Sequence, residues 1–209
     1  MKNNVLQLDL AKANKFLKEL EPIEIIEWMM NFSDNPMLTT NFGPYSASLI
    51  HAVNTVNKNI NVVWCDTGYN TSQTYDYAHH LIDRFSLNMD VYRPKSTSIY
   101  KDTSQGIPFI DTPEHELFTE EVKLEPFNRA LKEHQPDVWF TNLRADQNEH
   151  RSTLDILHIG KDGILKVSPF FYYSEFELEL YLQEFGLPNE KRYYDPTKVL
   201  AKRECGLHL

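Results

Sequence analysis

Apolar residues recur at helical spacing over residues 7–31, and Pro22 interrupts the pattern. A proline inside a helix removes a backbone hydrogen bond and clashes with the preceding turn, so the pattern predicts two short helices. A shorter apolar run at residues 37–43 ends in glycine and predicts a strand. A second helical pattern begins immediately afterwards, at Ser46.

The middle of the chain alternates between short apolar runs and longer amphipathic stretches. Residues 95–117, rich in Ser, Thr, Pro and Gly, are expected to form a long loop or cover. Apolar runs at 156–159 and 164–167 flank a Gly-Lys-Asp-Gly turn and predict a hairpin. The remaining predicted strands cover residues 60–65, 89–92 and 138–141, and the predicted helices cover residues 46–53, 71–85, 118–134 and 174–185.

Strands that alternate with helices are typical of an α/β fold. We therefore predict an open, mainly parallel, doubly wound sheet with helices on both faces. The length favours a single domain over residues 1–209. Within it we expect N-terminal helices at 1–31, the α/β core at 32–186, and a mobile C-terminal tail at 187–209.

Composition and charge exclude several classes of protein. No run approaches the ~20 apolar residues of a membrane span, and the chain starts with an amphipathic segment rather than a signal peptide. The net charge of −9 argues against general nucleic-acid binding. Two cysteines without a Cys-x-x-Cys pair supply too few ligands for zinc or an iron–sulfur cluster. We expect a cytoplasmic protein without a bound metal or cofactor.

A lone cysteine near the C-terminus, Cys205, stands among Lys202, Arg203 and His208. Positive neighbours stabilise a thiolate and lower the pKa of the thiol below its usual ~8.5. Cys205 is therefore either a reactive nucleophile or an incidental surface thiol, and its local sequence leaves both open.

Polar loops follow three predicted strands, at the end of the sheet where open α/β proteins bind ligands. The first loop contains Thr40, Gly43 and Ser46, and offers hydroxyls and backbone N–H groups at a helix start. This loop suits a phosphate, although it lacks the Gly-Lys-Ser/Thr of a Walker loop. The alternative is that it is an ordinary turn between a strand and a helix. In the second loop, Asp66 and Gly68 belong to an Asp-Thr-Gly-Tyr sequence. Asp66 either binds a ribose hydroxyl or shapes the turn.

The third loop contains Arg144 and Arg151, seven positions apart. On one helix they would lie two turns apart on the same face, where guanidinium groups bind phosphate or sulfate oxygens in pairs. The alternative is a solvated, charged start of a helix.

These segments together resemble the sulfonucleotide reductase family, and within it the 3′-phosphoadenylyl-sulfate (PAPS) reductases. The terminal Lys-Arg-Glu-Cys-Gly-Leu-His is identical to the motif of that family, and the order and spacing of the motifs are preserved over about residues 30–208. The matching stretches are the phosphate loop at 40–47, Asp-Thr-Gly-Tyr at 66–69, Lys-Leu-Glu-Pro-Phe-Asn-Arg-Ala-Leu at 123–131, the arginine loop at 143–151 and the end at 202–208.

The resemblance implies an adenine nucleotide alpha-hydrolase-like fold and thiol-dependent reduction of PAPS to sulfite in sulfate assimilation. Cys205 would attack the sulfur and form an enzyme S-sulfocysteine, which external thioredoxin or glutaredoxin would reduce. Lys202, Arg203 and His208 would stabilise the thiolate and the sulfonate oxygens. The resemblance also implies a homodimer.

For substrate binding, the resemblance implies that Arg144 and Arg151 hold the phosphosulfate. The phosphate loop would contribute Thr40, Gly43 and Ser46, and adenosine would lie near Asp66 and Gly68.

The sequence departs from the family pattern between the last predicted helix and the terminal motif at 202–208. A Gly-Tyr-x-Ser-Ile-Gly-Asp loop is missing, and only residues 187–198 occupy that interval.

Two alternatives to PAPS reduction are reduction of adenylyl sulfate without an iron–sulfur cluster and a non-catalytic role as a nucleotide-binding regulator. A third is an ATP-using adenylyltransferase or thiolase, whose loop carries an Asp that is absent here.

Overall fold

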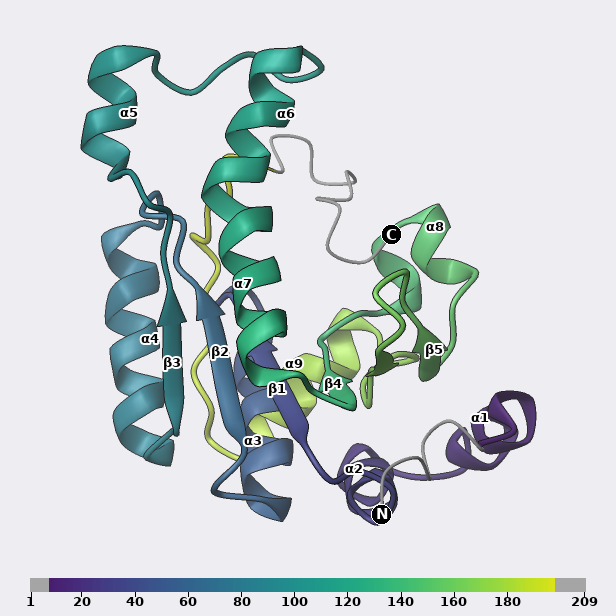
Figure 1. The fold of residues 1–209 in the computed structure, drawn as a ribbon. Helices are drawn as coiled ribbons and strands as arrows, with labels where there is room; N and C mark the ends of the chain where they lie inside the picture. The colour runs from purple at the N-terminus through teal and green to yellow at the C-terminus, as the bar shows by residue number, and fades with distance from the viewer. Residues whose placement is uncertain (1–7, 198–209) are drawn as a thin grey trace.

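A six-stranded sheet forms the centre of the computed structural model, which describes residues 8–197 (Figure 1). The strand order is β3-β2-β1-β4-β6-β5, and every neighbouring pair is parallel except the edge pair of β5 and β6. The prediction of an open, mainly parallel, doubly wound sheet is confirmed. The strands are β1 (Pro36–Thr40), β2 (Asn61–Cys65), β3 (Met89–Tyr92), β4 (Val138–Phe140), β5 (Leu157–Ile159) and β6 (Leu165–Val167).

Side chains alternate between the two faces of this sheet, as the period of a strand requires. Leu38 and Phe140 join the larger core, whereas Met37, Val63 and Trp139 join a smaller core on the opposite face. α7 (Glu125–His134) covers the smaller core, next to β2 and β3. The larger core lies against α2 (Pro22–Met30), α3 (Ser46–Val56), α4 (Ser72–Phe85) and α9 (Glu175–Glu184).

The two predicted N-terminal helices are present. α1 (Leu10–Leu17) packs against β5, and α2 begins at Pro22. Proline suits the first helical position because the N–H that it lacks has no partner there. The side chain of Glu24 accepts a hydrogen bond from the backbone N–H of Glu21, at 2.8 Å, and stabilises the start of α2.

The prediction of a loop or cover at residues 95–117 was wrong, because two helices begin there. The N-cap threonines Thr97 and Thr112 accept hydrogen bonds from backbone N–H groups three residues ahead. Their Ser- and Thr-rich surroundings are therefore helix starts. The two helices, α5 (Ser98–Ser104) and α6 (Pro113–Thr119), project beyond the sheet, and the π-helical turn η2 (Glu120–Leu124) joins α6 to α7 (Figure 1).

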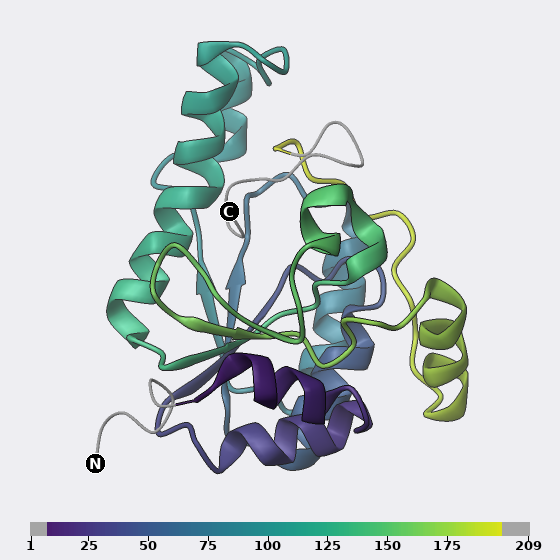
Figure 2. The ribbon, with the colours of Figure 1, turned by 90° about the vertical axis from the view of Figure 1, so that its right-hand side faces the viewer.

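Residues 187–197, which we call the strap, are the first part of the predicted tail. In Figures 1 and 2 the yellow strap runs from the end of α9 toward the end of the sheet at which the parallel strands finish. Arg84 fixes the chain just before the strap, because its guanidinium donates a hydrogen bond to the carbonyl of Gly186 at 2.8 Å. Leu187 and Thr197 are buried at its two ends.

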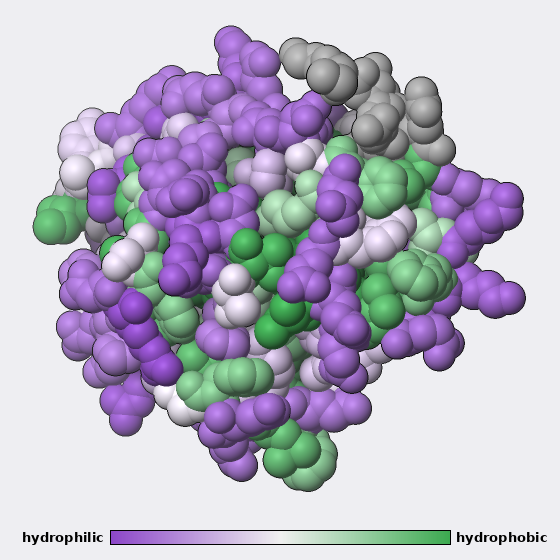
Figure 3. Space-filling model, turned by 90° about the horizontal axis from the view of Figure 1, so that it is seen from below, coloured by the Kyte–Doolittle hydropathy of each residue, from purple (hydrophilic) through white to green (hydrophobic). Residues whose placement is uncertain are grey.

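The opposite end of the molecule is mainly hydrophilic, with smaller groups of apolar residues between the polar ones (Figure 3). Within residues 8–197, no helix combines the length and the apolar character needed to cross a bilayer.

A partly buried histidine, His158, lies on edge strand β5 and pairs with Lys166 of β6. Burial, and secondarily the charge of Lys166, lower the pKa of His158 from 6.5 to about 4. Between these values the unfolded chain binds a proton that the folded chain does not, so stability falls as the pH falls. We therefore expect His158→Gln to reduce the loss of melting temperature between pH 7 and pH 5.

Thermal unfolding monitored by circular dichroism at both pH values measures this effect. His80→Gln is the matched control, because His80 is exposed. Equal losses in the wild type and in His158→Gln would contradict the prediction.

Candidate active site

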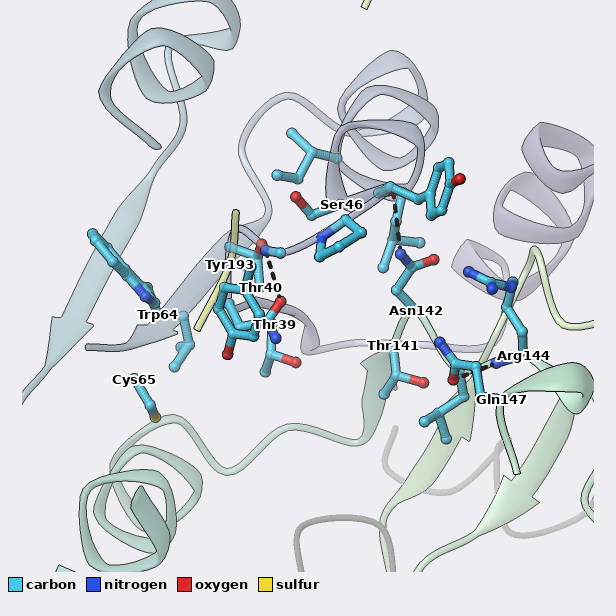
Figure 4. Close-up of a pocket in the computed structure, with 18 of the residues that line it drawn as sticks. Thr39, Thr40, Ser46, Trp64, Cys65, Thr141, Asn142, Arg144, Gln147 and Tyr193 are labelled. Atoms are coloured by element: carbon cyan, nitrogen blue, oxygen red, sulfur yellow. Dashed lines mark hydrogen bonds between the residues drawn. The ribbon is translucent and has the colours of Figure 1, made fainter. Parts of the chain in front are cut away.

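A cavity of about 620 Å³ opens at the carboxyl ends of β1, β2 and β4 (Figure 4). The strand order reverses here, because β2 lies on one side of β1 and β4 on the other. Open α/β sheets bind ligands at such a reversal. The loops after all three strands, together with residues of η2, α7 and the strap, line the cavity.

The loop between β1 and α3 forms one wall. Thr40 Oγ1 accepts a hydrogen bond from the N–H of Phe42, and Asn41 Oδ1 accepts one from the N–H of Gly43, both at 3.0 Å. Phe42 and Tyr45 have φ angles of 52° and 60°, so both adopt the left-handed conformation and turn the chain sharply before α3. All three residues predicted for the phosphate loop, Thr40, Gly43 and Ser46, line the cavity.

The strap packs against the loop between β1 and α3. A Cβ atom on Gly43 would lie only 3.2 Å from Cγ of Tyr193, so any larger residue would have to displace the Tyr193 ring by a few tenths of an ångström. Asn189 Oδ1 accepts a hydrogen bond from the N–H of Tyr45 at 2.9 Å. Tyr193 itself lines the cavity (Figure 4). The short strap therefore supplies a wall, although the Gly-Tyr-x-Ser-Ile-Gly-Asp loop is missing.

Asp66 and Gly68 shape the second loop and do not line the cavity. Oδ1 of the buried Asp66 accepts hydrogen bonds from the N–H of Gly68 at 3.0 Å and from the Tyr75 hydroxyl at 2.7 Å. Gly68 has a φ of +80°, a conformation that favours glycine. Of the two roles open to Asp66, these contacts favour shaping the turn. Neighbouring residues Thr67 and Asn70 reach the cavity instead.

Arg144 and Arg151 both line the cavity but do not share a helix, so the expected helical relation was wrong. A 3-10 turn, η3 (Ala145–Gln147), follows Arg144, and an extended Asn148 separates it from the short α8 (Glu149–Ser152). Gln147 joins the two arginines instead. Its Oε1 accepts a hydrogen bond from the N–H of Arg144 at 3.1 Å and another from the Arg151 guanidinium.

Three cationic side chains, Arg144, Arg151 and Lys123, line this cavity with two carboxylates, Asp146 and Glu175, so cations are in excess within a chain of net charge −9. All three are buried. Arg144 Nε donates to Asp146 at 3.0 Å, and its Nη2 lies 3.4 Å from Glu175. Buried guanidinium groups and a lysine suit a ligand with several anionic oxygens.

The sequence did not identify several residues of this cavity. Lys123 begins the motif at residues 123–131, but no local signal in the sequence indicates that its ammonium is buried. Polar residues that follow β4 also contribute, and Asn142 donates to the carbonyl of Tyr45 at 3.2 Å. The further residues that line the cavity and were not predicted include Cys65, Trp64, Thr141, Asn142, Gln147 and Tyr193 (Figure 4).

Cys65, at the end of β2, is a thiol in the cavity wall. Burial raises its pKa to about 12 despite the nearby charges of Lys123 and Arg129. At pH 8, roughly one thiol in ten thousand is then ionised, against about a quarter at the ordinary pKa. We expect iodoacetamide to label Cys65 on the order of a thousand times more slowly in the folded chain than in urea-unfolded chain.

Peptide mapping of Cys65 by mass spectrometry over a time course measures both rates. The unfolded sample is the control for reagent activity. Rates within tenfold of one another would contradict a pKa raised by burial.

The four predicted catalytic residues, Cys205, Lys202, Arg203 and His208, lie outside the described residues. Among residues 8–197, no three His, Cys, Asp or Glu side chains are grouped so that they could hold a metal ion.

The fold and this site define an open α/β protein with a cation-lined pocket at the reversal of strand order. Residues 35–195 match the model of the phosphoadenosine phosphosulfate reductase domain. The chain belongs to this family. The prediction of the family, and of an oxidoreductase within it, is confirmed.

Individual relatives agree with this assignment. The phosphoadenosine 5′-phosphosulfate reductase of Klebsiella pneumoniae is 32% identical, over 96% of this chain and 92% of its own length. Among solved structures, a PAPS reductase from Candida auris superposes with a TM-score of 0.77 at 24% identity, over 88% of this chain and 89% of that one. A tRNA thiolase from Methanococcus maripaludis shares the fold alone, with a TM-score of 0.61 at 14% identity, over 90% of this chain and 69% of its own.

Proposed function

We propose that this protein reduces 3′-phosphoadenylyl sulfate to sulfite and adenosine 3′,5′-bisphosphate. One observation carries the proposal: a cavity at the reversal of strand order, lined by Arg144, Arg151 and the phosphate loop, lies within the 35–195 match to the reductase domain. The relatives from Klebsiella pneumoniae and Candida auris are named as reductases of this substrate. Anionic oxygens at both ends of the phosphosulfate suit this arrangement of cations and hydroxyls.

In the proposed reaction, the Cys205 thiolate attacks the sulfur of the sulfonate group. The bond between that sulfur and the bridging oxygen breaks, and adenosine 3′,5′-bisphosphate leaves with the electron pair. Lys202, Arg203 and His208 stabilise the thiolate before attack and the sulfonate oxygens after it. Arg144 and Arg151 neutralise the departing phosphate and reduce the repulsion between an anionic nucleophile and an anionic substrate.

The enzyme S-sulfocysteine then requires an external dithiol. One thiolate of thioredoxin or glutaredoxin attacks Sγ of Cys205, sulfite leaves with the electron pair, and a mixed disulfide forms. The second thiol of the reductant resolves this disulfide, restores Cys205 and leaves the reductant oxidised. A homodimer in the cytoplasm, without a bound cofactor, belongs to the same proposal.

Intact-mass measurement of the reduced protein after separate incubation with PAPS and with adenylyl sulfate tests this function. We expect the mass of one SO₃ group to be added after PAPS, and peptide mapping to locate it on Cys205 and not on Cys65. An adduct only with adenylyl sulfate would indicate the alternative substrate. No adduct with either nucleotide would favour a non-catalytic regulator.

A further inference from the structure

A buried lysine, Lys123, begins the helix motif at residues 123–131, and the proposed function gives it no role. It lies in the π-helical turn η2, and its side chain is only 8% exposed. Lysine is almost never buried to this extent unless it is paired. π-helical turns are rare and occur frequently at functional sites.

Lys123 contacts the end of the strap. Its ammonium forms an ion pair with Asp195, whose side chain is 3% exposed, and donates to Thr197 Oγ1 at 3.2 Å. The other carboxylate oxygen of Asp195 accepts from the N–H of Thr197 at 3.0 Å and from its hydroxyl at 2.6 Å. Lys123 and Asp195, which are 72 positions apart in the sequence, are therefore both buried, and hydrogen bonds connect them and Thr197.

A second contact holds the same part of the strap. A ring nitrogen of the buried His115, on α6, lies 3.1 Å from the carbonyl oxygen of Pro196. Burial alone would raise the pKa of Asp195, but Lys123 and the hydrogen bonds from Thr197 outweigh it and lower that pKa below its usual value. Asp195 therefore stays ionised at neutral pH, and its ion pair with Lys123 persists.

We propose that Lys123, Asp195 and Thr197 are positioning residues that fix the end of the strap and thereby direct Cys205 to the cavity. This inference rests on the proposed function of Cys205. Thr197 stands eight positions before Cys205, so an extended chain between them spans at most about 29 Å. Because Lys123 both lines the cavity and contacts Thr197, the fixed point lies at the edge of the site.

The size of the effect distinguishes positioning from simple tethering. Even if the loss of the Asp195 contact also freed Pro196 from His115, Asn189 would remain as a fixed point, 16 positions before Cys205. Doubling the length of a flexible tether lowers the effective concentration at its end by only about threefold. Misplacing a reacting group by about 1 Å costs up to about a hundredfold. A positioning role therefore predicts a loss well above threefold.

Asp195→Asn is the main test, with single-turnover formation of S-sulfocysteine from PAPS as the readout. We expect the rate to fall at least tenfold. The affinity for adenosine 3′,5′-bisphosphate should not weaken, because Asp195 does not line the cavity and every residue that lines it is unchanged. Hydrogen exchange of the peptide that contains residues 187–197 should become faster in this variant.

Glu121→Gln is the matched control, because Glu121 lies in the same turn η2 as Lys123 and its carboxylate pairs with another buried lysine, Lys101 of α5. It should leave the adduct rate unchanged. A folded Asp195→Asn within about threefold of the wild-type rate would overturn the inference. If Asp195→Asn does not fold, Thr197→Val decides by the same limit. A wild-type protein that forms no adduct would overturn the proposed function, and this inference with it.

Discussion

Replacing Cys205 by serine is expected to lower sulfite release by at least about a thousandfold. A serine hydroxyl stays protonated at neutral pH and is a much weaker nucleophile than a thiolate, so no S-sulfo intermediate forms. The variant keeps Cys65 in the cavity wall, where burial raises the pKa to about 12. We therefore do not expect Cys65 to substitute for the missing thiol. Sulfite assayed with excess PAPS, thioredoxin and reductant measures the effect.

Nucleotide binding provides the control for this variant. Arg144, Arg151 and the phosphate loop are unchanged in it, so adenosine 3′,5′-bisphosphate should bind with the wild-type affinity in a calorimetric titration. Sulfite release at the wild-type rate would exclude the proposed mechanism. Loss of both activity and nucleotide binding would point to a defect of the fold rather than of the chemistry.

The sheet was predictable because its strands carry a strong local signal. Met37, Leu38, Val62 and Val63 are apolar on both faces of the sheet, as expected for parallel strands covered by helices on each side. The alternation of strands and helices then favours parallel pairing, with right-handed connections between the strands. In contrast, α5 and α6 are short, and their Thr caps and exposed surfaces resemble loop composition.

The location of the site was predictable from topology, but its contacts were not. Residues that follow β1 and β4 meet because parallel strands bring their carboxyl ends together. Nothing local indicates that Gln147 joins Arg144 to Arg151, since that contact depends on a 3-10 turn and an extended Asn148. The Lys123 and Asp195 pair depends on how the chain returns after α9.

Charge balance explains how the fold accommodates the buried cations of this cavity. Asp146 and Glu175 contact Arg144, and Asp195 pairs with Lys123. Uncompensated buried charges are costly, so these carboxylates stabilise the fold. They are exposed to different extents: the side chain of Glu175 is 69% exposed, whereas that of Asp195 is 3% exposed. An anionic substrate therefore competes more easily for Arg144 than for Lys123.

Replacing Arg151 by alanine is expected to lower kcat/KM for PAPS by about a hundredfold to a thousandfold. Removing one preorganised donor from charge that develops in the transition state typically has this effect. The buried guanidinium of Arg151 lines the cavity and donates to Gln147, which also accepts from the N–H of Arg144. The variant therefore loses a cation and loosens the loop that carries the second arginine. Steady-state sulfite assays over a range of PAPS concentrations measure kcat/KM of the variant and of the wild type.

Two further variants separate charge from geometry. Arg151→Lys keeps the charge but loses the planar donor pair, so we expect activity between those of alanine and wild type. Arg129→Ala removes an arginine that pairs with Glu125 and does not line the cavity, and it should retain wild-type kcat/KM. If Arg151→Ala stays within threefold of the wild type, Arg151 does not stabilise the departing phosphate. The charge would then have to come from Arg144 and Lys123, which makes Arg144→Ala the decisive comparison.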